Sequence, residues 1–351
     1  APFAPALSRF EEPLDLNLVF SGHGKHLDCP TLQLANHHGL MIAGEAALSN
    51  WDAGMDMYIY GKLGNLIMTK EGINVLMTNL TGKVPPILQR LDYIRFNGEA
   101  AGYLHDLTLT GLFYTGAGMV KTDVMMSIDE QSMSRTYSGS VASADLDLGK
   151  LLNQEKKFGK VDFNVELKGF NYKNRYPESY IKGIISSFEY SQYQYENIML
   201  DGVYKDGGFN GRLSMDDANG SVQIDGNFNV AKTIPDFNLK ASVKNLRPHD
   251  LHLSDKYENA SISLGLTADF TGKSIDDMNG RISLDSLQLN APDERGCFLD
   301  NLTITAGQVS GEKELRINSS FMTAVIRGDY SYHTIPASVV KTVQRYIPSL
   351  L

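Results

Sequence analysis

Cysteine is almost absent from this chain of 351 residues, which contains only Cys29 and Cys297. Two cysteines this far apart in sequence can pair only if the fold brings their Cα atoms within about 7 Å of each other. We therefore expect no disulfide framework. The cysteine count leaves the compartment open, because it suits a reducing cytosol and also a periplasm whose proteins do not depend on disulfides.

Long runs of one residue type are also missing. No stretch of about 18 apolar residues occurs, so no segment is predicted to span a bilayer as a helix. No basic run exceeds Lys156-Lys157 and the formal net charge is -9, which argues against a nucleic-acid partner because phosphate binding needs clustered Lys and Arg. No signal peptide is recognised, and residues 1–5 are typical of a processed end inside a larger protein.

What the chain does contain is a repeated alternation of apolar and polar residues. In residues 161–168 every odd position is apolar and every even position is polar or charged. Side chains alternate between the two faces of a strand, so this segment has one apolar and one polar face. The sequence therefore predicts an all-β fold. We expect an elongated, curled antiparallel β-sheet of repeated strands, groove-like or closing to a sandwich, with two or three short helices.

Three segments are predicted to be helical. Residues 85–91 open with proline, which suits a first helical turn, and Asp147 is a suitable N-cap for residues 147–152. Residues 336–351 are predicted to form a C-terminal amphipathic helix. The polar stretch 127–135 divides the rest of the chain into an N-terminal β-repeat segment, 1–135, and a second β-repeat segment, 136–335.

Hairpin turns are predicted at three glycine-containing positions. These are Asp206-Gly207-Gly208, Asn219-Gly220 and Asn279-Gly280. The Asn-Gly pairs are the stronger signals, because a type I′ turn needs a positive φ at both central residues.

The candidate catalytic and metal-binding motifs are incomplete. His23, His26 and Cys29 have half the pattern of a zinc site, but residues three apart on a strand face opposite sides and no second ligand pair follows. Residues 21–25 lack the spacing of a phosphate loop, and residues 137–140 lack the Gly-x-Ser-x-Gly elbow. We therefore predict no metal, no cofactor and no catalytic residues, and expect a protein that is not an enzyme.

Two aspartate pairs and a cluster of tyrosines each have a structural interpretation as well as a functional one. The pairs Asp216-Asp217 and Asp276-Asp277 could bind calcium, but they lie in turn-like sequence where Asp is favoured for backbone reasons. A tyrosine cluster could stack on sugars, whereas two tyrosines on one strand face more often pack against neighbouring strands. The cluster comprises Tyr172, Tyr176, Tyr180, Tyr190, Tyr193 and Tyr195.

The remaining candidate site is the apolar face of the predicted sheet. An ordinary sandwich closes such a face against a second sheet. A curled repetitive sheet leaves it open, and an open apolar surface of more than a few hundred Å² usually marks a lipid, membrane or protein partner. The alternation of apolar and polar residues is the same in a closed sandwich and in an open sheet, so it does not distinguish the two. The predicted lining of a hydrophobic groove comprises Val161, Phe163, Val165, Leu167, Val222, Ile224, Phe228, Val230, Phe237, Leu239, Val243, Ile262, Leu264, Leu266, Phe270, Ile282 and Leu284.

Several motifs, taken in order, resemble one protein family. Residues 137–141 (Tyr-Ser-Gly-Ser-Val), 146–152 and 159–163 are similar to a module of the TamB translocation and assembly proteins, as found in Bacteroidetes. The similarity continues through residues 195–198, 200–204, 208–211, 235–239, 245–251 and 268–272. Residues 94–102 are a fainter example of the same repeat. Each motif has low specificity, so the resemblance rests on their order.

The resemblance implies a periplasmic, AsmA-like protein whose inner-membrane anchor lies outside this segment. It implies a curled sheet with a hydrophobic trough and an outer-membrane β-barrel partner. The implied function is phospholipid transport between the inner and outer membranes, or outer-membrane protein assembly. The expected ligands are phospholipid acyl chains or nascent outer-membrane β-strands. The family's membrane helix and C-terminal domain have no counterpart in this sequence, and the family brings no catalytic residues.

The alternative is a secreted or surface β-sandwich. Such a binding module would recognise glycan or protein through tyrosine-rich loops. The two hypotheses differ in whether the apolar residues face a second sheet or an open side.

Overall fold

The structure is a computed structural model that describes residues 13, 15–129, 131–132, 134–171, 178–255, 258–273, 275–291, 296–329 and 331. The chain divides into two compact units, residues 1–200 and 201–351. The described residues form 19 antiparallel strands, with 69% of residues in strands and 7% in helices, so the predicted all-β fold is confirmed. The predicted repeat segments 1–135 and 136–335 stay a prediction, and the predicted helix 336–351 lies outside the described residues.

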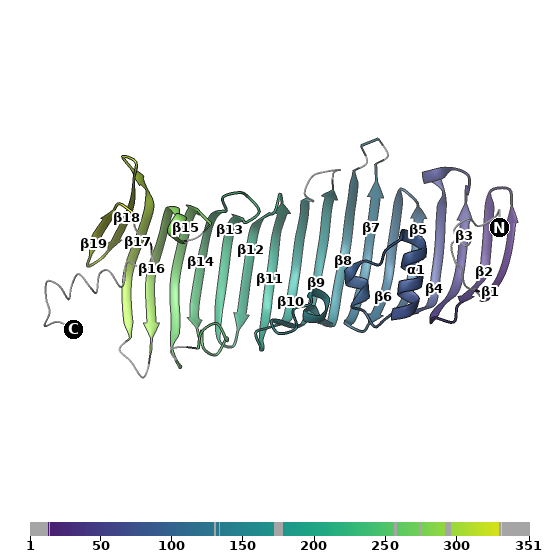
Figure 1. Ribbon diagram of the computed structural model, residues 1–351, viewed down its shortest axis with the longest axis horizontal. Helices are drawn as coiled ribbons and strands as arrows, with labels where there is room; N and C mark the ends of the chain where they lie inside the picture. The colour runs from purple at the N-terminus through teal and green to yellow at the C-terminus, as the bar shows by residue number, and fades with distance from the viewer. Residues whose placement is uncertain are drawn as a thin grey trace. The chain divides into compact units, whose positions relative to one another are not determined.

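The first unit is a meander in which each strand pairs antiparallel with the next one along the chain, from β1 to β10 (Figure 1). Most connections between these strands are short, which favours antiparallel pairing between consecutive strands. Its strands are β1 (Asp15–His23), β2 (His26–Ala35), β3 (Leu40–Ser49), β4 (Tyr58–Thr69), β5 (Tyr93–Tyr103), β6 (Asp106–Thr115), β7 (Gly118–Ile128), β8 (Arg135–Asp147), β9 (Phe158–Asn171) and β10 (Glu178–Tyr190).

The second unit repeats this arrangement. Its strands pair antiparallel in chain order from β12 to β19. They are β12 (Gly208–Asp217), β13 (Gly220–Asn229), β14 (Asp236–Leu246), β15 (Ser261–Thr271), β16 (Asn279–Asn290), β17 (Cys297–Val309), β18 (Glu312–Ser319) and β19 (Thr323–Arg327). Between the two meanders, β11 (Tyr193–Lys205) contains the division at residue 200.

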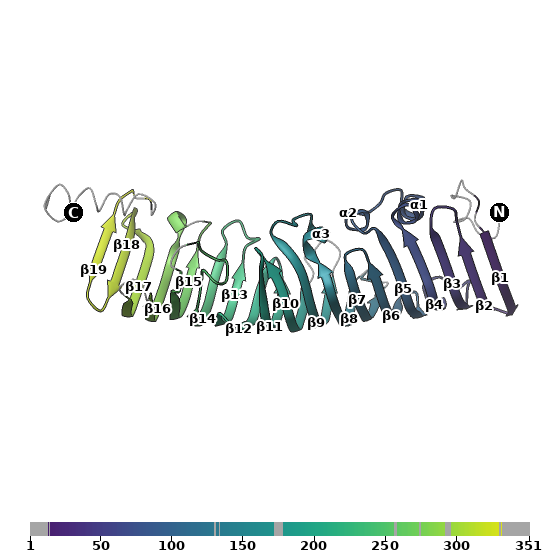
Figure 2. The same ribbon diagram turned by 90° about the horizontal axis from the view of Figure 1, so that it is seen from below.

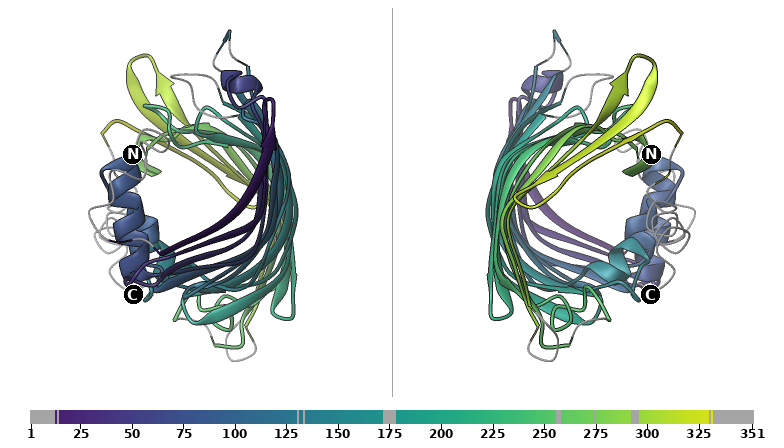
Figure 3. Two further views of the ribbon diagram at one scale, coloured as in Figure 1. Left: turned by 90° about the vertical axis from the view of Figure 1, so that its right-hand side faces the viewer. Right: turned by 90° about the vertical axis from the view of Figure 1, so that its left-hand side faces the viewer.

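The sheet is unclosed, and the described strands form no second sheet that faces the first. In the first unit the strands curve into an arc, and α1 lies on the open side of that arc (Figure 3). Of the two arrangements that the sequence left open, the structure therefore has the unclosed one.

Three short helices belong to the first unit and lie on one side of its sheet (Figure 2). They are α1 (Lys70–Thr81), α2 (Pro86–Gln89) and α3 (Leu148–Leu152); two 3₁₀ turns, η2 (Gly54–Asp56) and η3 (Ile275–Asp277), complete the helical elements of the described residues. The predicted helices at 85–91 and 147–152 are confirmed, and the Asp147 side chain accepts a hydrogen bond from Lys150 N at 2.8 Å, as an N-cap does.

Helix α1 was not predicted from the sequence. Its signals are present: the Thr69 side chain caps the N-terminus by accepting from Gly72 N, and Gly82 ends the helix in the left-handed region with φ 74°. Gly72 inside the first turn weakens the helical pattern, because glycine lowers helix propensity.

One of the three predicted hairpin turns is confirmed. In the other two, the Asn-Gly pair does not occupy the two central positions of a turn. Asp206 and Gly207 have φ values of 51° and 76° and join β11 to β12. Asn219 is not at positive φ, and Gly220, with φ 133°, already begins β13. Asn279-Gly280 lies inside β16, where a Cβ on Gly280 would sit 2.5 Å from the Cα of Phe270. Glycine at 280 is therefore explained by close strand approach rather than by a turn.

Candidate functional site: the apolar faces

In the second unit, strand register brings apolar residues into continuous rows. Residues directly opposite each other on adjacent strands point to the same face. One row joins Phe209, Phe228, Phe237 and Phe270 on β12 to β15, with ring centroids 5.9 Å apart in the first pair and 4.7 Å in the last. The next two rows are Leu239, Ala268, Ile282 and Ile304, then Ile224, Ala241, Leu266, Leu284 and Leu302.

The opposite face of the second unit carries the charges. Arg212 Nη2 lies 3.0 Å from Asp225 Oδ2, in a cross-strand row that continues to Lys240 and Thr267. On the same face the Glu314 carboxylate accepts hydrogen bonds from Arg327 Nε at 2.7 Å and Arg316 Nη2 at 3.0 Å. These hydrogen bonds, Arg327 first, hold the pKa of Glu314 below its usual range. Two chemically different faces result.

The first unit shows the same separation. Across β4 to β10 one apolar row runs through Leu66, Phe96, Phe113, Val120, Ser143, Phe163 and Ile185. The hydroxyl of Ser143, its one polar member, donates to Val161 O at 3.0 Å. The row on the other face runs through Glu99, Thr110, Asp123, Ser140, Glu166 and Lys182.

Most of the predicted groove-lining residues are half-buried. Val161 is only 3% exposed, Phe228 is 38% exposed, and Val230, at 60%, lies beyond the end of β13. All other residues of the predicted lining are half-buried. Half-burial is what a single sheet produces, because neighbouring side chains cover one another while no second layer covers them all. The role of these residues as a groove lining stays a prediction.

The helices cover one part of the apolar face in the first unit. Ile73 of α1 packs in a buried cluster with Leu91, Ile94 and Ala117, and Leu88 and Leu151 of the other two helices contact it. Polar contacts link the helical segments to one another: Arg90 Nη1, at the end of α2, donates to Leu151 O of α3, and Lys150 Nζ of α3 lies 2.7 Å from Asp92 Oδ2, just before β5. The hydrogen bond from Lys150 holds the pKa of Asp92 below its usual range.

Glycines on the apolar faces lie beneath aromatic rings. A Cβ added to Gly111 would lie 2.5 Å from Phe96 Cε2 and 2.7 Å from Asn97 O. The same arrangement recurs with Tyr137 beside Gly169. These pairs were not predicted from the sequence, although a glycine inside an alternating strand pattern is the usual sign of a close approach.

The six tyrosines of the predicted cluster do not form one group in the structure. Tyr190, Tyr193 and Tyr195 gather with Phe158 and Phe188, with centroid distances of 4.8 Å for Tyr193 and Tyr195 and 5.5 Å for Phe158 and Tyr190. The Nζ of Lys157 lies 5.7 Å from the ring centroids of both Phe158 and Tyr190. Tyr180 lies opposite Lys168 on the polar face, and residues 172 and 176 lie outside the described residues.

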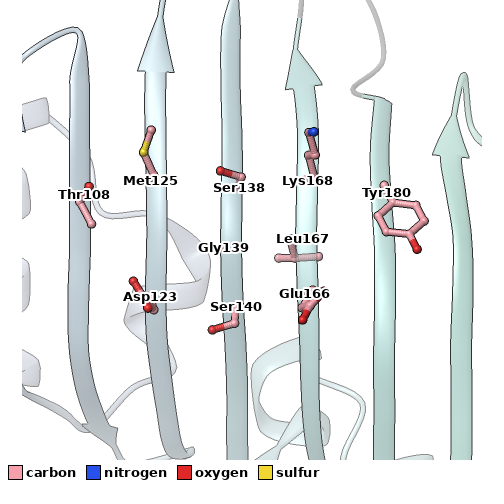
Figure 4. A pocket seen from close by; sticks show the side chains of 10 residues that line it. All are labelled: Thr108, Asp123, Met125, Ser138, Gly139, Ser140, Glu166, Leu167, Lys168 and Tyr180. Atoms are coloured by element: carbon pink, nitrogen blue, oxygen red, sulfur yellow. The ribbon is translucent and has the colours of Figure 1, made fainter.

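A shallow depression of about 560 Å³ lies on the polar face of the first unit (Figure 4). Its polar lining comes from successive strands β6 to β10, and Thr110, next to it in the sheet, donates to Asp123 at 3.1 Å. The lining comprises Thr108, Asp123, Met125, Ser138, Gly139, Ser140, Glu166, Leu167, Lys168 and Tyr180. Carboxylates, a lysine and hydroxyls alternate here, which is typical of a solvated strand face.

The histidine and aspartate motifs have local partners. His26 Nδ1 lies 2.7 Å from Ser49 Oγ and its Nε2 lies 2.9 Å from Asp28 Oδ2, while the thiol of Cys29 donates to Thr31 O. Asp217 Oδ1 accepts from Asn219 N at 2.9 Å, which is the backbone contact of a turn aspartate. Among the described residues, no group of three or more His, Cys, Asp or Glu side chains has a geometry that could hold a metal ion.

None of the helices in the described part of the chain has the length and apolar character needed to cross a membrane. No family model, curated protein or solved structure matches the chain. The function is therefore inferred from the two faces of the sheet.

Proposed function

We propose that this chain is a non-enzymatic segment of a cell-envelope protein whose apolar face holds phospholipid acyl chains. The observation that carries the proposal is the combination of continuous apolar rows with an unclosed sheet. Each unit separates its charges onto one face and leaves half-buried Phe, Leu, Ile and Val side chains on the other.

Such a face suits an acyl chain for a simple energetic reason. Burying apolar surface contributes about 25 cal/mol per Å². A chain of methylene groups laid across the rows gains this stabilisation from many weak contacts with no directional bond. It can therefore shift along the face by exchanging one apolar contact for the next, which suits transport rather than storage.

A nascent outer-membrane β-strand is a second candidate client. All nine residues of β1 are exposed, including Leu18 at 39% and Phe20 at 66%. An exposed apolar strand at the start of a meander can accept another strand through main-chain hydrogen bonds. This observation favours a role in assembling outer-membrane proteins beside lipid transport.

The wider setting of the proposal comes from the TamB resemblance. In that setting the segment is periplasmic, an anchor outside it lies in the inner membrane, and an outer-membrane β-barrel is its partner. The open face is compatible with this setting and does not depend on it.

The test is native mass spectrometry of the protein purified from cells without detergent. We expect adducts with phospholipid masses, which disappear after organic extraction and return when lipid is added back. A lipid-free protein that also takes up no added lipid would contradict the proposal. If that protein bound glycans instead, the alternative of a surface recognition module would replace it.

A further inference from the structure

Lys157 is fixed at one end of the apolar face of the first unit. Its main-chain N–H donates to Gln154 O at 3.0 Å, and its carbonyl accepts from Ser191 N at 2.8 Å, so both sides of the residue are tied to neighbouring turns. Its ammonium group lies over Phe158 and Tyr190, 5.7 Å from each ring centroid. Cation–π contacts of this kind hold a lysine side chain in place without neutralising its charge.

The rings beneath this lysine continue the apolar face. Phe188 lies directly opposite Val161, and Phe163 follows two residues along the same strand face. Tyr190 and Tyr195 contact Phe188 with centroid distances of 6.2 Å and 6.5 Å, and Tyr195 is only 8% exposed. Tyrosine rings have an apolar body and a polar hydroxyl. A patch of such rings is therefore suited to the boundary between the apolar surface and water.

Lys157 differs from neighbouring lysines in how its charge is balanced within the described residues. Neighbouring lysines are paired: Lys160 lies 2.9 Å from Asp145 Oδ1 and Lys150 lies 2.7 Å from Asp92 Oδ2. Within the described parts of the chain, no carboxylate lies within ion-pair distance of Lys157. An exposed cation at the end of an apolar face complements an anionic amphiphile, with the anion at the lysine and the hydrocarbon on the face.

We propose that Lys157 and its aromatic patch bind the phosphate of an anionic phospholipid whose acyl chains lie along Val161, Phe163 and Val165. This inference rests on the proposed function, because it places the headgroup of the lipid that the apolar face holds. It adds a lipid class: phosphatidylglycerol is preferred over phosphatidylcholine, since only the former keeps a net negative charge beside the lysine.

The test compares two acyl-labelled fluorescent lipids with the same chains, phosphatidylglycerol and phosphatidylcholine, titrated into the full chain. Wild type should bind phosphatidylglycerol about fivefold more tightly, the size of effect that a solvent-accessible ion pair gives. Lys157→Gln should abolish this preference, because phosphatidylglycerol then loses more affinity than phosphatidylcholine does. Lys157→Arg should keep it, and Lys156→Gln, which removes the adjacent exposed lysine, should have no effect.

Each outcome separates the two proposals. Equal binding of both lipids by wild type, or a preference that survives Lys157→Gln, overturns the Lys157 site and leaves the lipid-binding face standing. Binding of neither lipid overturns both. Inorganic phosphate in excess should not displace the labelled phosphatidylglycerol, because most of its affinity comes from the acyl chains; full displacement would make Lys157 a site for free phosphate and would overturn the lipid assignment.

Discussion

Single residues decide how closely the strands of this sheet approach each other. Gly111 leaves room for the Phe96 ring and for Asn97 O, both of which would lie within 2.7 Å of an added Cβ. Because one of these atoms is backbone, the neighbour cannot rotate away. We expect Gly111→Ala to destabilise the protein by about 1–3 kcal/mol, as overpacking does, measured by urea unfolding.

Gly61 provides the matched control for this prediction. It lies on the same apolar face in β4, opposite Ala46 and Ala100, and an added Cβ there would meet nothing within 4 Å. Gly61→Ala should therefore be neutral or slightly stabilising, since it only reduces the freedom of the unfolded chain. Equal losses of stability at both positions would contradict the prediction, because they would show that the close approach at Gly111 is not what makes this position sensitive.

At the scale of elements, the helices supply the packing that a single sheet lacks. Ile73 of α1 is 1% exposed and contacts the cluster around Leu91 and Ile94. Truncation of such a side chain leaves a cavity beside groups fixed by the sheet. We expect Ile73→Ala to cost about 2–4 kcal/mol, measured as a lower urea midpoint.

The control for α1 is its neighbour Asn74, which is exposed. Asn74→Ala should change the free energy of unfolding by less than about 0.5 kcal/mol. If Ile73→Ala were equally mild, α1 would not be held by its contacts with the sheet, and the covered part of the apolar face would be smaller than the structure shows.

At the scale of the whole molecule, an open apolar face should tolerate charge better than a closed core. Leu264 in β15 is half-buried, so water can still reach an aspartate placed there. We expect Leu264→Asp to weaken binding of a fluorescent phospholipid while leaving the urea midpoint nearly unchanged. In a closed core the same change would bury an unpaired carboxylate and cost several kcal/mol.

Thr267 of the same strand gives the comparison on the opposite face, where it is exposed. Thr267→Asp should alter neither lipid binding nor the midpoint. A collapsed midpoint in Leu264→Asp, with Thr267→Asp unaffected, would mean that this part of the face is packed as a core, and the open-face hypothesis would fail at that position.

The amino-acid sequence by itself determined the strands and their two faces. The alternation in residues 161–168 is a local property of a period-two backbone, so it places Phe163 and Glu166 on opposite faces whatever surrounds them. Local signals also located α2 and α3, since a proline in the first turn and an aspartate cap act within a few residues.

Only the tertiary structure decided what faces the apolar side. Gly280 lies in a strand because it pairs with Phe270, ten positions earlier, and Ile73 is buried because α1 folds back onto the sheet. These contacts depend on strand pairing and helix docking, which local periodicity does not encode. A second sheet over the apolar rows would have matched the same alternation, so the unclosed meander follows from how the strands assemble.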